Sequence, residues 1–306
     1  MLTALCRFGG DFMICRLCPR QCGADRENTF GFCGMGRSVR LARAALHQWE
    51  EPCISGADPS RGSGTVFFSG CVMRCVFCQN HEISAGGKGK DVSTQRLSEI
   101  FLELQEQGAY NINLVNPTHF VPQIMQALDM VKDRLRIPVV YNSGGYERVE
   151  TLRALEGYVD VWLPDIKYFS DGLAQELSQA PGYFDTAMSA VEEMLRQTGK
   201  PAFAPDGMLK SGVIVRHLVL PYHYRDSVEV ISRVGERFGK DVLFSLMSQY
   251  TPFYKAREIP RLNRRITTFE YRKALDAVYA AGLEGFMQER SSAKEEYTPD
   301  FDLSGI

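Results

Sequence analysis

One stretch of the sequence decides the fold: Gly64-Thr-Val-Phe-Phe-Ser-Gly-Cys71-Val-Met-Arg-Cys75-Val-Phe77-Cys78-Gln-Asn80. Its apolar, β-branched and aromatic run, residues 65–68, predicts a buried strand, and the Ser-Gly pair that follows predicts the turn that ends it. The three cysteines, spaced C-x3-C-x2-C, are therefore expected on a loop at the carboxyl end of that strand. In parallel α/β proteins this is the face on which sites are built.

The three cysteines, Cys71, Cys75 and Cys78, are close enough in sequence to converge on one metal centre. A [4Fe–4S] cluster usually takes four cysteines, one per iron, so three leave one iron free to coordinate a small molecule. Zinc normally takes four nitrogen or sulfur ligands, and His81 is then the candidate for the fourth. Three ordinary core cysteines are the remaining alternative. The strand before the loop favours the cluster.

The composition excludes several classes of protein. A chain of 306 residues is long enough for one large α/β domain or a core with a small appendage. With a net charge of −2 the chain has no excess of positive charge, so nucleic acid is not an expected partner. With no apolar run of about 18 residues and no signal peptide, we expect no membrane span and a cytoplasmic location. In a reducing compartment, nine cysteines favour metal binding over disulfides.

The sequence predicts a division into a cysteine-rich N-terminal segment, residues 1–61, and a core with a C-terminal extension, residues 62–306. The segment carries the pattern C-x2-C-x3-C-x10-C at Cys15, Cys18, Cys22 and Cys33. Four thiolates can hold zinc or a second iron–sulfur cluster, and a loop without metal is the alternative. Cys6 and Cys53 fit neither set of cysteines and are expected to be buried, inert thiols.

From residue 65 onward, strand-like and helical patterns alternate. Apolar strand-like runs appear at 65–69, 111–115, 138–142, 159–163, 212–219 and 242–247. In the first helical pattern, Leu97, Ile100, Phe101 and Leu104 recur at helical spacing. Such alternation predicts right-handed βαβ units and a parallel sheet. Six units predict a barrel, open or partly closed, with the cysteine loop on its carboxyl-end face.

Polar residues follow most of the expected strands, and we expect them to converge on one ligand beside the cysteines. Asp165 and Lys167 share a face of a strand, which suits either a structural ion pair or ligand contacts. Arg216 can bind a carboxylate or cap the sheet edge. His119 and His217 are expected to be structural histidines. The other polar strand ends are Asn116-Pro-Thr118-His119, Asn142-Ser143 and Ser248-Gln249-Tyr250.

One acidic pair lies in the stretch that joins the N-terminal segment to the core. Glu50 and Glu51 precede Pro52, which together with Gly56 breaks any helix there. Catalytic carboxylates are one interpretation. A solvated pair in a linker is the one that we favour from the sequence.

Taken together, these motifs resemble the glycyl-radical-enzyme activating branch of the radical S-adenosylmethionine (SAM) superfamily, and within it the pyruvate formate-lyase activating enzyme homologues of the PflX-like group. The resemblance runs over most of the chain, through Cys15-Arg-Leu-Cys18-Pro-Arg-Gln-Cys22, Glu50-Glu51-Pro-Cys53-Ile-Ser-Gly, Gly62-Ser-Gly-Thr-Val-Phe-Phe-Ser-Gly-Cys71 and Ser245-Leu-Met-Ser-Gln-Tyr-Thr-Pro252. It implies a partial (β/α)6 barrel of the TIM type. It also implies a [4Fe–4S] cluster on Cys71, Cys75 and Cys78, and SAM bound near Phe77, Asn142, Ser143, Asp165, Lys167 and Arg216.

The chain departs from the activating enzymes at three places, one of which is Ser248-Gln249-Tyr250 where they have a sixth-strand Pro-Tyr-His. Their Gly-Gly-Glu motif after the second strand, which holds the SAM amino group, is replaced by Asn116-Pro-Thr118-His119. Thr118 and His119 are the candidates to substitute for it, although neither supplies a carboxylate. Asn142-Ser143 stands where the activating enzymes have Asp-Thr, and this removes a charge.

The sequence therefore predicts a radical SAM oxidoreductase, with SAM and the cluster as cofactors and no catalytic residue beyond the cluster. The resemblance implies a flavodoxin-like or ferredoxin-like electron donor and a glycyl radical enzyme as partner. One alternative is radical chemistry on a small molecule, a peptide or a modified RNA. Another is a metal-binding or redox-sensing protein that never cleaves SAM.

Overall fold

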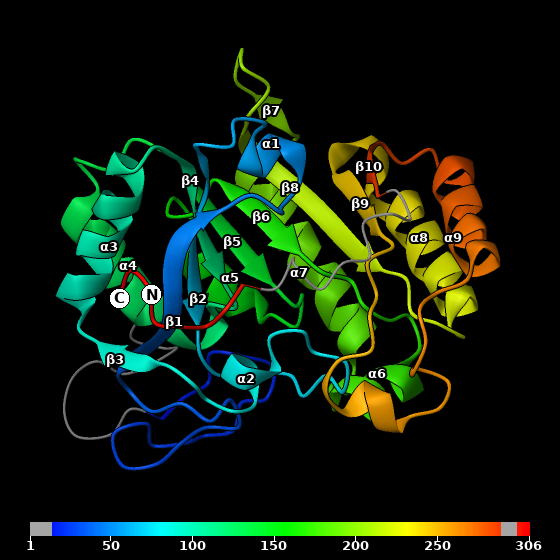
Figure 1. Cartoon of the computed structure of the whole chain (residues 1–306), viewed down its shortest axis with the longest axis horizontal. Helices are drawn as coiled ribbons and strands as arrows, with labels where there is room; N and C mark the ends of the chain where they lie inside the picture. The colour runs from blue at the N-terminus through cyan, green and yellow to red at the C-terminus, as the bar shows by residue number, and fades with distance from the viewer. Residues whose placement is uncertain (1–13, 289–298) are drawn as a thin grey trace.

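A mostly parallel sheet forms the centre of the molecule (Figure 1). The computed structural model describes residues 14–288 and 299–306, and in them the strands follow the order β10-β9-β8-β6-β5-β4-β2-β1-β3. Neighbours from β2 to β10 run parallel, whereas β1, β3 and a short strand beside β8, β7, pair antiparallel. The strands are β1 (Val39–His47), β2 (Gly62–Phe68), β3 (Lys90–Val92), β4 (Ala109–Val115), β5 (Val139–Ser143), β6 (Val161–Pro164), β7 (Ala202–Phe203), β8 (Leu209–Leu218), β9 (Leu243–Met247) and β10 (Gly285–Met287).

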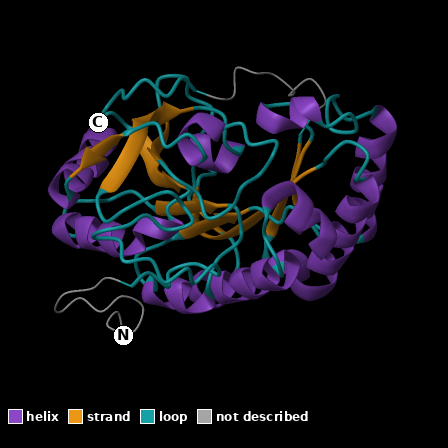
Figure 2. Ribbon diagram, turned by 90° about the horizontal axis from the view of Figure 1, so that it is seen from below, coloured by secondary structure: helices purple, strands orange, loops and turns teal. Residues whose placement is uncertain are grey.

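Helices connect the parallel strands and cover the outside of the curved sheet, with the strands inside (Figure 2). The first, α3, begins where the Ser93 side chain accepts a hydrogen bond from the backbone N–H of Arg96, and its predicted apolar stripe is buried. The helices are α1 (Pro52–Ser55), α2 (His81–Ser84), α3 (Thr94–Glu106), α4 (Val121–Val131), α5 (Val149–Ala154), α6 (Asp171–Ser178), α7 (Tyr183–Thr198), α8 (Tyr224–Phe238) and α9 (Thr268–Ala280). The prediction of an α/β partial barrel is confirmed.

The antiparallel strand β1 was not among the predicted strands. Its sequence contains Ala42, Ala44 and Ala45, which have no β propensity of their own, but it forms a ladder along β2 with His47 opposite Ser63. The sheet thus begins inside residues 1–61, and the division of the chain at residue 62 stays a prediction. Among the described residues, none of the helices combines the length and the apolar character needed to cross a membrane.

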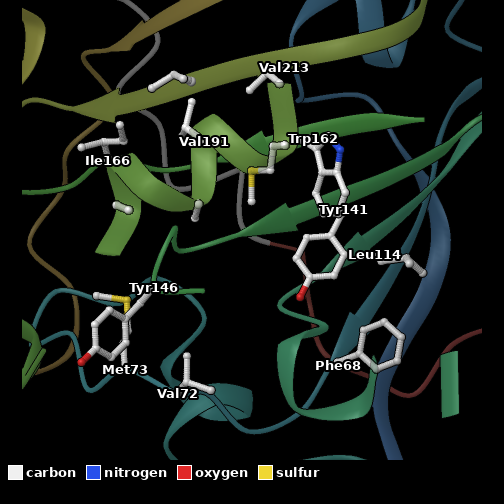
Figure 3. Packing of buried hydrophobic residues seen from close by; sticks show 14 of the residues in the cluster. Phe68, Val72, Met73, Leu114, Tyr141, Tyr146, Trp162, Ile166, Val191 and Val213 are labelled. Carbon is white, nitrogen blue, oxygen red and sulfur yellow. The ribbon is translucent and has the colours of Figure 1, made fainter. Parts of the chain in front are cut away.

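The core lies between the sheet and the outer helices. Figure 3 shows part of it: Trp162 of β6 lies beside Tyr141 of β5, with ring centroids 5.1 Å apart. Both side chains are fully buried. Burial of large side chains of this kind contributes about 1.5–3 kcal/mol each, and it fixes the spacing of the strands whose ends carry the site.

Candidate functional site

A cavity of about 250 Å³ brings together all nine residues that the sequence singled out for the cluster and for SAM. They come from the loop after β2 and from the ends of β5, β6 and β8. The nine are Cys71, Cys75, Phe77, Cys78, Asn142, Ser143, Asp165, Lys167 and Arg216. Their convergence follows from the parallel sheet, because the carboxyl ends of its strands meet at one face.

Backbone hydrogen bonds hold the cysteine loop in place. The N–H of Gly70 donates to the carbonyl of Ile83 (2.9 Å), and the N–H of Val76 donates to the carbonyl of Leu177 at the end of α6 (2.9 Å). Gly70 has φ +83°, and a Cβ there would lie 2.4 Å from the Met35 side chain. A glycine is therefore needed where the chain leaves β2 and passes close to the N-terminal segment.

Each of the three cysteines expected to hold the cluster has a hydrogen-bonding neighbour at its sulfur. Ser178 Oγ donates to Cys75 Sγ (2.9 Å), and Ser84 Oγ lies 3.3 Å from Cys78 Sγ. The third sulfur, of Cys71, accepts from the backbone N–H of Met73 (3.4 Å). Such bonds orient ligand side chains and stabilise the electron-rich forms of an iron–sulfur cluster.

Burial keeps these cysteines protonated when they hold no metal. It raises the pKa of Cys71 to about 12 and that of Cys78 to about 11, and it also raises the pKa of Cys75. A metal binds the thiolate and not the thiol, so loading of the site must release protons.

Three thiols without a fourth nitrogen or sulfur ligand suit a cluster better than one zinc ion. In residues 14–288 and 299–306, no three Cys, His, Asp or Glu side chains converge closely enough to hold a single metal ion. A [4Fe–4S] cluster takes one thiolate on each iron, so its ligands do not have to meet around a single ion. His81, the candidate fourth zinc ligand, stacks on Tyr254 instead, with ring centroids 5.0 Å apart.

A network of charges forms one wall of the cavity. Asp165 accepts from Lys167 Nζ (2.5 Å) at one oxygen and from Arg216 Nε (2.9 Å) at the other. Burial alone would raise the pKa of Asp165, but the two cations outweigh it and lower the pKa. Burial likewise opposes the charge on Lys167, yet Asp165 raises its pKa above the usual value. All three groups are therefore ionised at neutral pH, and the ion pair lies in the cavity wall.

Glu50 belongs to the same network, and the expectation of a solvated pair in a linker is wrong. Its Oε2 lies 3.0 Å from Arg216 Nη1, and its Oε1 accepts from the side-chain amides of Asn113 (3.0 Å) and Asn142 (3.1 Å). Only 11% of the Glu50 side chain is exposed. Glu51 is buried too, and burial raises its pKa. The antiparallel strand β1 ends beside the start of β2. Residue 50, which follows β1, therefore enters the barrel at the amino ends of the parallel strands.

Thr118 and His119, the candidates to replace the Gly-Gly-Glu motif, do not line the cavity. Thr118 Oγ1 donates to Glu147 (2.7 Å), and His119 Nε2 lies 2.7 Å from the carbonyl of Ser69. Both side chains are buried. That substitution is therefore wrong, and Asn116 is the residue of this turn that reaches the cavity.

His119, His217 and Cys53 agree with what the sequence predicts for them. His119 and His217 are buried, and burial lowers the pKa of both, so each is a neutral structural histidine. Cys53 is buried, and burial raises its pKa to about 12, as expected of an inert thiol. Cys6 lies outside the described residues.

The sequence model of the radical SAM superfamily matches residues 65–237, more than half of the chain. The chain belongs to the radical SAM superfamily. Its cofactors are accordingly those expected from the sequence, a [4Fe–4S] cluster and SAM. The residues fit them, because three thiols share one cavity with groups of both charges.

Individual proteins similar to this radical SAM chain have been found among sequences and among solved structures. The uncharacterized protein MJ0674 of Methanocaldococcus jannaschii is 32% identical over 274 residues, which are 87% of this chain and 74% of that protein. Streptococcus suis SuiB, solved bound to its precursor peptide SuiA, is 14% identical with a TM-score of 0.47, over 72% of this chain and 46% of SuiB. The anSMEcpe structure with bound AdoMet is 12% identical with a TM-score of 0.46, over 72% of this chain and 61% of anSMEcpe. This chain thus spans about half the length of SuiB.

Proposed function

We propose that this radical SAM protein cleaves SAM reductively and uses the resulting radical to abstract one hydrogen atom from a substrate. One observation carries the proposal: three thiols share a cavity with two cations, Lys167 and Arg216, and two carboxylates, Asp165 and Glu50. When bound, the cluster supplies one electron, and SAM on accepting it separates into methionine and a 5′-deoxyadenosyl radical. The tasks left to the protein are binding, orientation and exclusion of water.

The charges in the cavity complement the methionine end of SAM, which carries an ammonium and a carboxylate. Lys167 and Arg216 offer hydrogen-bond donors for the carboxylate. Asp165 and Glu50 offer acceptors for the ammonium, and a carboxylate keeps free lone pairs after two or three hydrogen bonds. Phe77 lines the same cavity and supplies an apolar wall for the adenine.

Glu50 supplies the carboxylate that the sequence lacks after the second strand of the barrel. It reaches the cavity from a different part of the chain, and the amides of Asn113 and Asn142 fix its orientation. We expect Glu50→Gln to weaken SAM binding about tenfold, because one charge-assisted contact contributes roughly 1.5 kcal/mol. Isothermal titration of the anaerobic protein with SAM measures this, and unchanged affinity would remove Glu50 from the proposal.

For the substrate we propose a backbone glycine of a glycyl radical enzyme, as in pyruvate formate-lyase activating enzymes. The support is the resemblance of the N-terminal cysteine motif and of Ser245–Pro252 to the PflX-like group. The adenosyl radical takes one hydrogen atom from the glycine Cα and becomes 5′-deoxyadenosine, and the unpaired electron stays on the glycine. A cytoplasmic flavodoxin-like or ferredoxin-like protein is the proposed electron donor.

The first test is the formation of 5′-deoxyadenosine from SAM by anaerobically purified protein with dithionite as reductant. We expect product with the wild type and none with Cys71→Ala, while Cys53→Ala, a buried thiol outside the cavity, serves as the matched control. Product from Cys71→Ala at the wild-type rate would contradict the assignment of the cluster loop.

The choice of substrate needs a separate test. A glycyl radical enzyme of the pyruvate formate-lyase type, labelled with α-deuterated glycine, is added to the reaction. We expect deuterium in the 5′-deoxyadenosine and an organic radical in the partner by electron paramagnetic resonance. Unlabelled product and no radical in the partner would point to a small molecule or peptide as substrate.

A further inference from the structure

The N-terminal segment from Ile14 to Ser38 has no helix and no ladder of its own in the structure. One isolated bridge joins Ile14 to Asp25, and the rest consists of turns and bends. Its local apolar cluster consists of Cys15 and Leu17. A segment of this length without secondary structure normally needs a crosslink or a bound metal to keep one shape. The described cysteines are all free thiols, so a disulfide does not provide that crosslink.

The turns of this segment bring Cys15, Cys22 and Cys33 near one another, and Cys18 interacts electrostatically with Cys15 and Cys33. The backbone N–H of Cys15 donates to the carbonyl of Ala24 (2.9 Å), and its carbonyl accepts from Gly23 (3.1 Å), which brings Cys15 beside the turn that follows Cys22. A Cβ added to Gly31 would lie 3.3 Å from Cys33 Sγ and 3.5 Å from Cys22 Sγ. The glycine thus leaves the two sulfurs facing the same small space.

Two arginines beside these sulfurs have unsatisfied donors. Arg20 Nη2 and Arg26 Nε are buried and have no hydrogen-bond partner among the described residues. Arg20 interacts electrostatically with the thiol of Cys18, and Arg26 with that of Cys33. Buried cationic N–H groups without acceptors are costly, and an anionic ligand between the sulfurs would satisfy them.

The four cysteines also lie next to the cluster loop. The backbone N–H of Cys71 donates to the carbonyl of Cys33 (3.3 Å), and Arg20 Nε donates to the carbonyl of Val72 (3.0 Å). The ring of Phe32 contacts the guanidinium groups of Arg20 and Arg74, at 4.0 and 4.7 Å from its centroid. One backbone hydrogen bond therefore joins the two cysteine groups.

We propose that Cys15, Cys18, Cys22 and Cys33 bind a second iron–sulfur cluster, separate from the cluster on Cys71, Cys75 and Cys78. Four cysteines match one ligand per iron in a [4Fe–4S] cluster, whose net negative charge suits the unpaired arginine donors. A redox-active centre beside the cluster loop can also pass an electron to that loop, as the proposed function requires, whereas zinc has no redox chemistry.

The test counts iron, zinc and acid-labile sulfide in a Cys71→Ala/Cys75→Ala/Cys78→Ala variant, reconstituted anaerobically with iron and sulfide. We expect about four iron and four sulfide per chain to remain, against about eight of each in the wild type, with the Mössbauer spectrum of a fully ligated [4Fe–4S] cluster. This result does not depend on SAM cleavage, so it stands or falls apart from the proposed function. A variant with no iron, or with one zinc per chain, would overturn the proposal.

A second variant guards against a failure to fold. Cys22 is exposed, so Cys22→Ser should not disturb packing. In the triple-variant background it should remove the remaining iron while the far-ultraviolet circular dichroism stays unchanged. Cys53→Ala in the same background is the matched control and should retain the iron. If Cys22→Ser retains it too, Cys22 is not a ligand and the four-cysteine site is wrong.

Discussion

Removal of Arg216 should destabilise the protein strongly, because it leaves two buried carboxylates without their shared cation. Arg216 lies within 3.0 Å of Glu50 and within 2.9 Å of Asp165, and the three side chains are only 11–14% exposed. In an Arg216→Met variant, Asp165 keeps Lys167 at 2.5 Å, whereas the Glu50 carboxylate keeps two neutral amides as its side-chain partners among the described residues. The removal of one partner from a buried pair costs about 3–5 kcal/mol, and here most of the loss should come from Glu50.

The assay is urea unfolding of anaerobically purified protein, followed by circular dichroism at pH 7. Glu50→Gln combined with Arg216→Met removes the stranded charge, so we expect the double variant to regain about half of the lost free energy of unfolding. Arg233→Met is the control: it breaks a pair of the same 3.0 Å length with Glu236, but on the surface, and should cost less than about 1 kcal/mol. If Arg216→Met costs no more than this control, or if the double variant is no more stable than Arg216→Met, then Arg216 does not stabilise a buried Glu50 carboxylate.

Three further substitutions test other parts of the structure. Hydrogen bonds to Glu270 outweigh its burial and lower its pKa from 4.5 to about 2, so its stabilisation is complete above pH 4.5 and is lost as the pH falls toward 2. We expect Glu270→Gln to lower the free energy of unfolding by about 2 kcal/mol at pH 7, in urea titrations whose difference from the wild type shrinks below pH 4.5. Gly145 has φ +76°, and a Cβ would lie 2.0 Å from the backbone oxygen of Asp165, so Gly145→Ala should cost about 3 kcal/mol in thermal unfolding. Ser178→Ala removes the hydrogen bond to Cys75 Sγ and should lower the reduction potential of the bound cluster in a redox titration.

Each of these expectations has a result that would contradict it. Gly157 has φ +84° but nothing within 4 Å of its added Cβ, so Gly157→Ala should lose only about 1 kcal/mol from backbone strain. If Gly145→Ala and Gly157→Ala lose the same stability in thermal unfolding, the structure relieves the clash with the backbone oxygen of Asp165. A constant difference between Glu270→Gln and the wild type down to pH 2 would mean that the carboxylate is not the stabilising form. An unchanged potential in Ser178→Ala would show that the serine does not donate to the cluster ligand.

The sequence predicted the cavity residues that lie at or after the end of a parallel strand. The cysteine spacing, Asp165 with Lys167, and Arg216 all follow strands, and the sheet geometry carries them to one face without further information. Their roles toward SAM and the cluster are still predictions, but their meeting in one cavity is a property of the fold.

The position of Glu50 could not be predicted from the sequence. It follows an alanine-rich antiparallel strand and enters the barrel from the opposite end, and its contacts with Asn113 and Asn142 span 63 and 92 residues of sequence. Such pairings depend on the closed tertiary structure and leave no periodic signal. The prediction for Thr118 was wrong for the opposite reason. Thr118 does follow a strand, but its side chain donates a hydrogen bond to Glu147 and is buried in the core.

The docking of the N-terminal segment has a consequence for the order of events during synthesis. The segment is held to the core by groups that are translated long after it, because Thr151 donates to the carbonyl of Leu17 (2.6 Å) and Arg148 to that of Arg16 (2.8 Å). At about 5–20 residues per second, a ribosome takes roughly 7–27 s to add those 130-odd residues. In this interval the early cysteines have no fold to shield them. Oxygen is therefore most harmful to the nascent chain, and aerobic expression should damage these thiols even though the finished fold buries three of them.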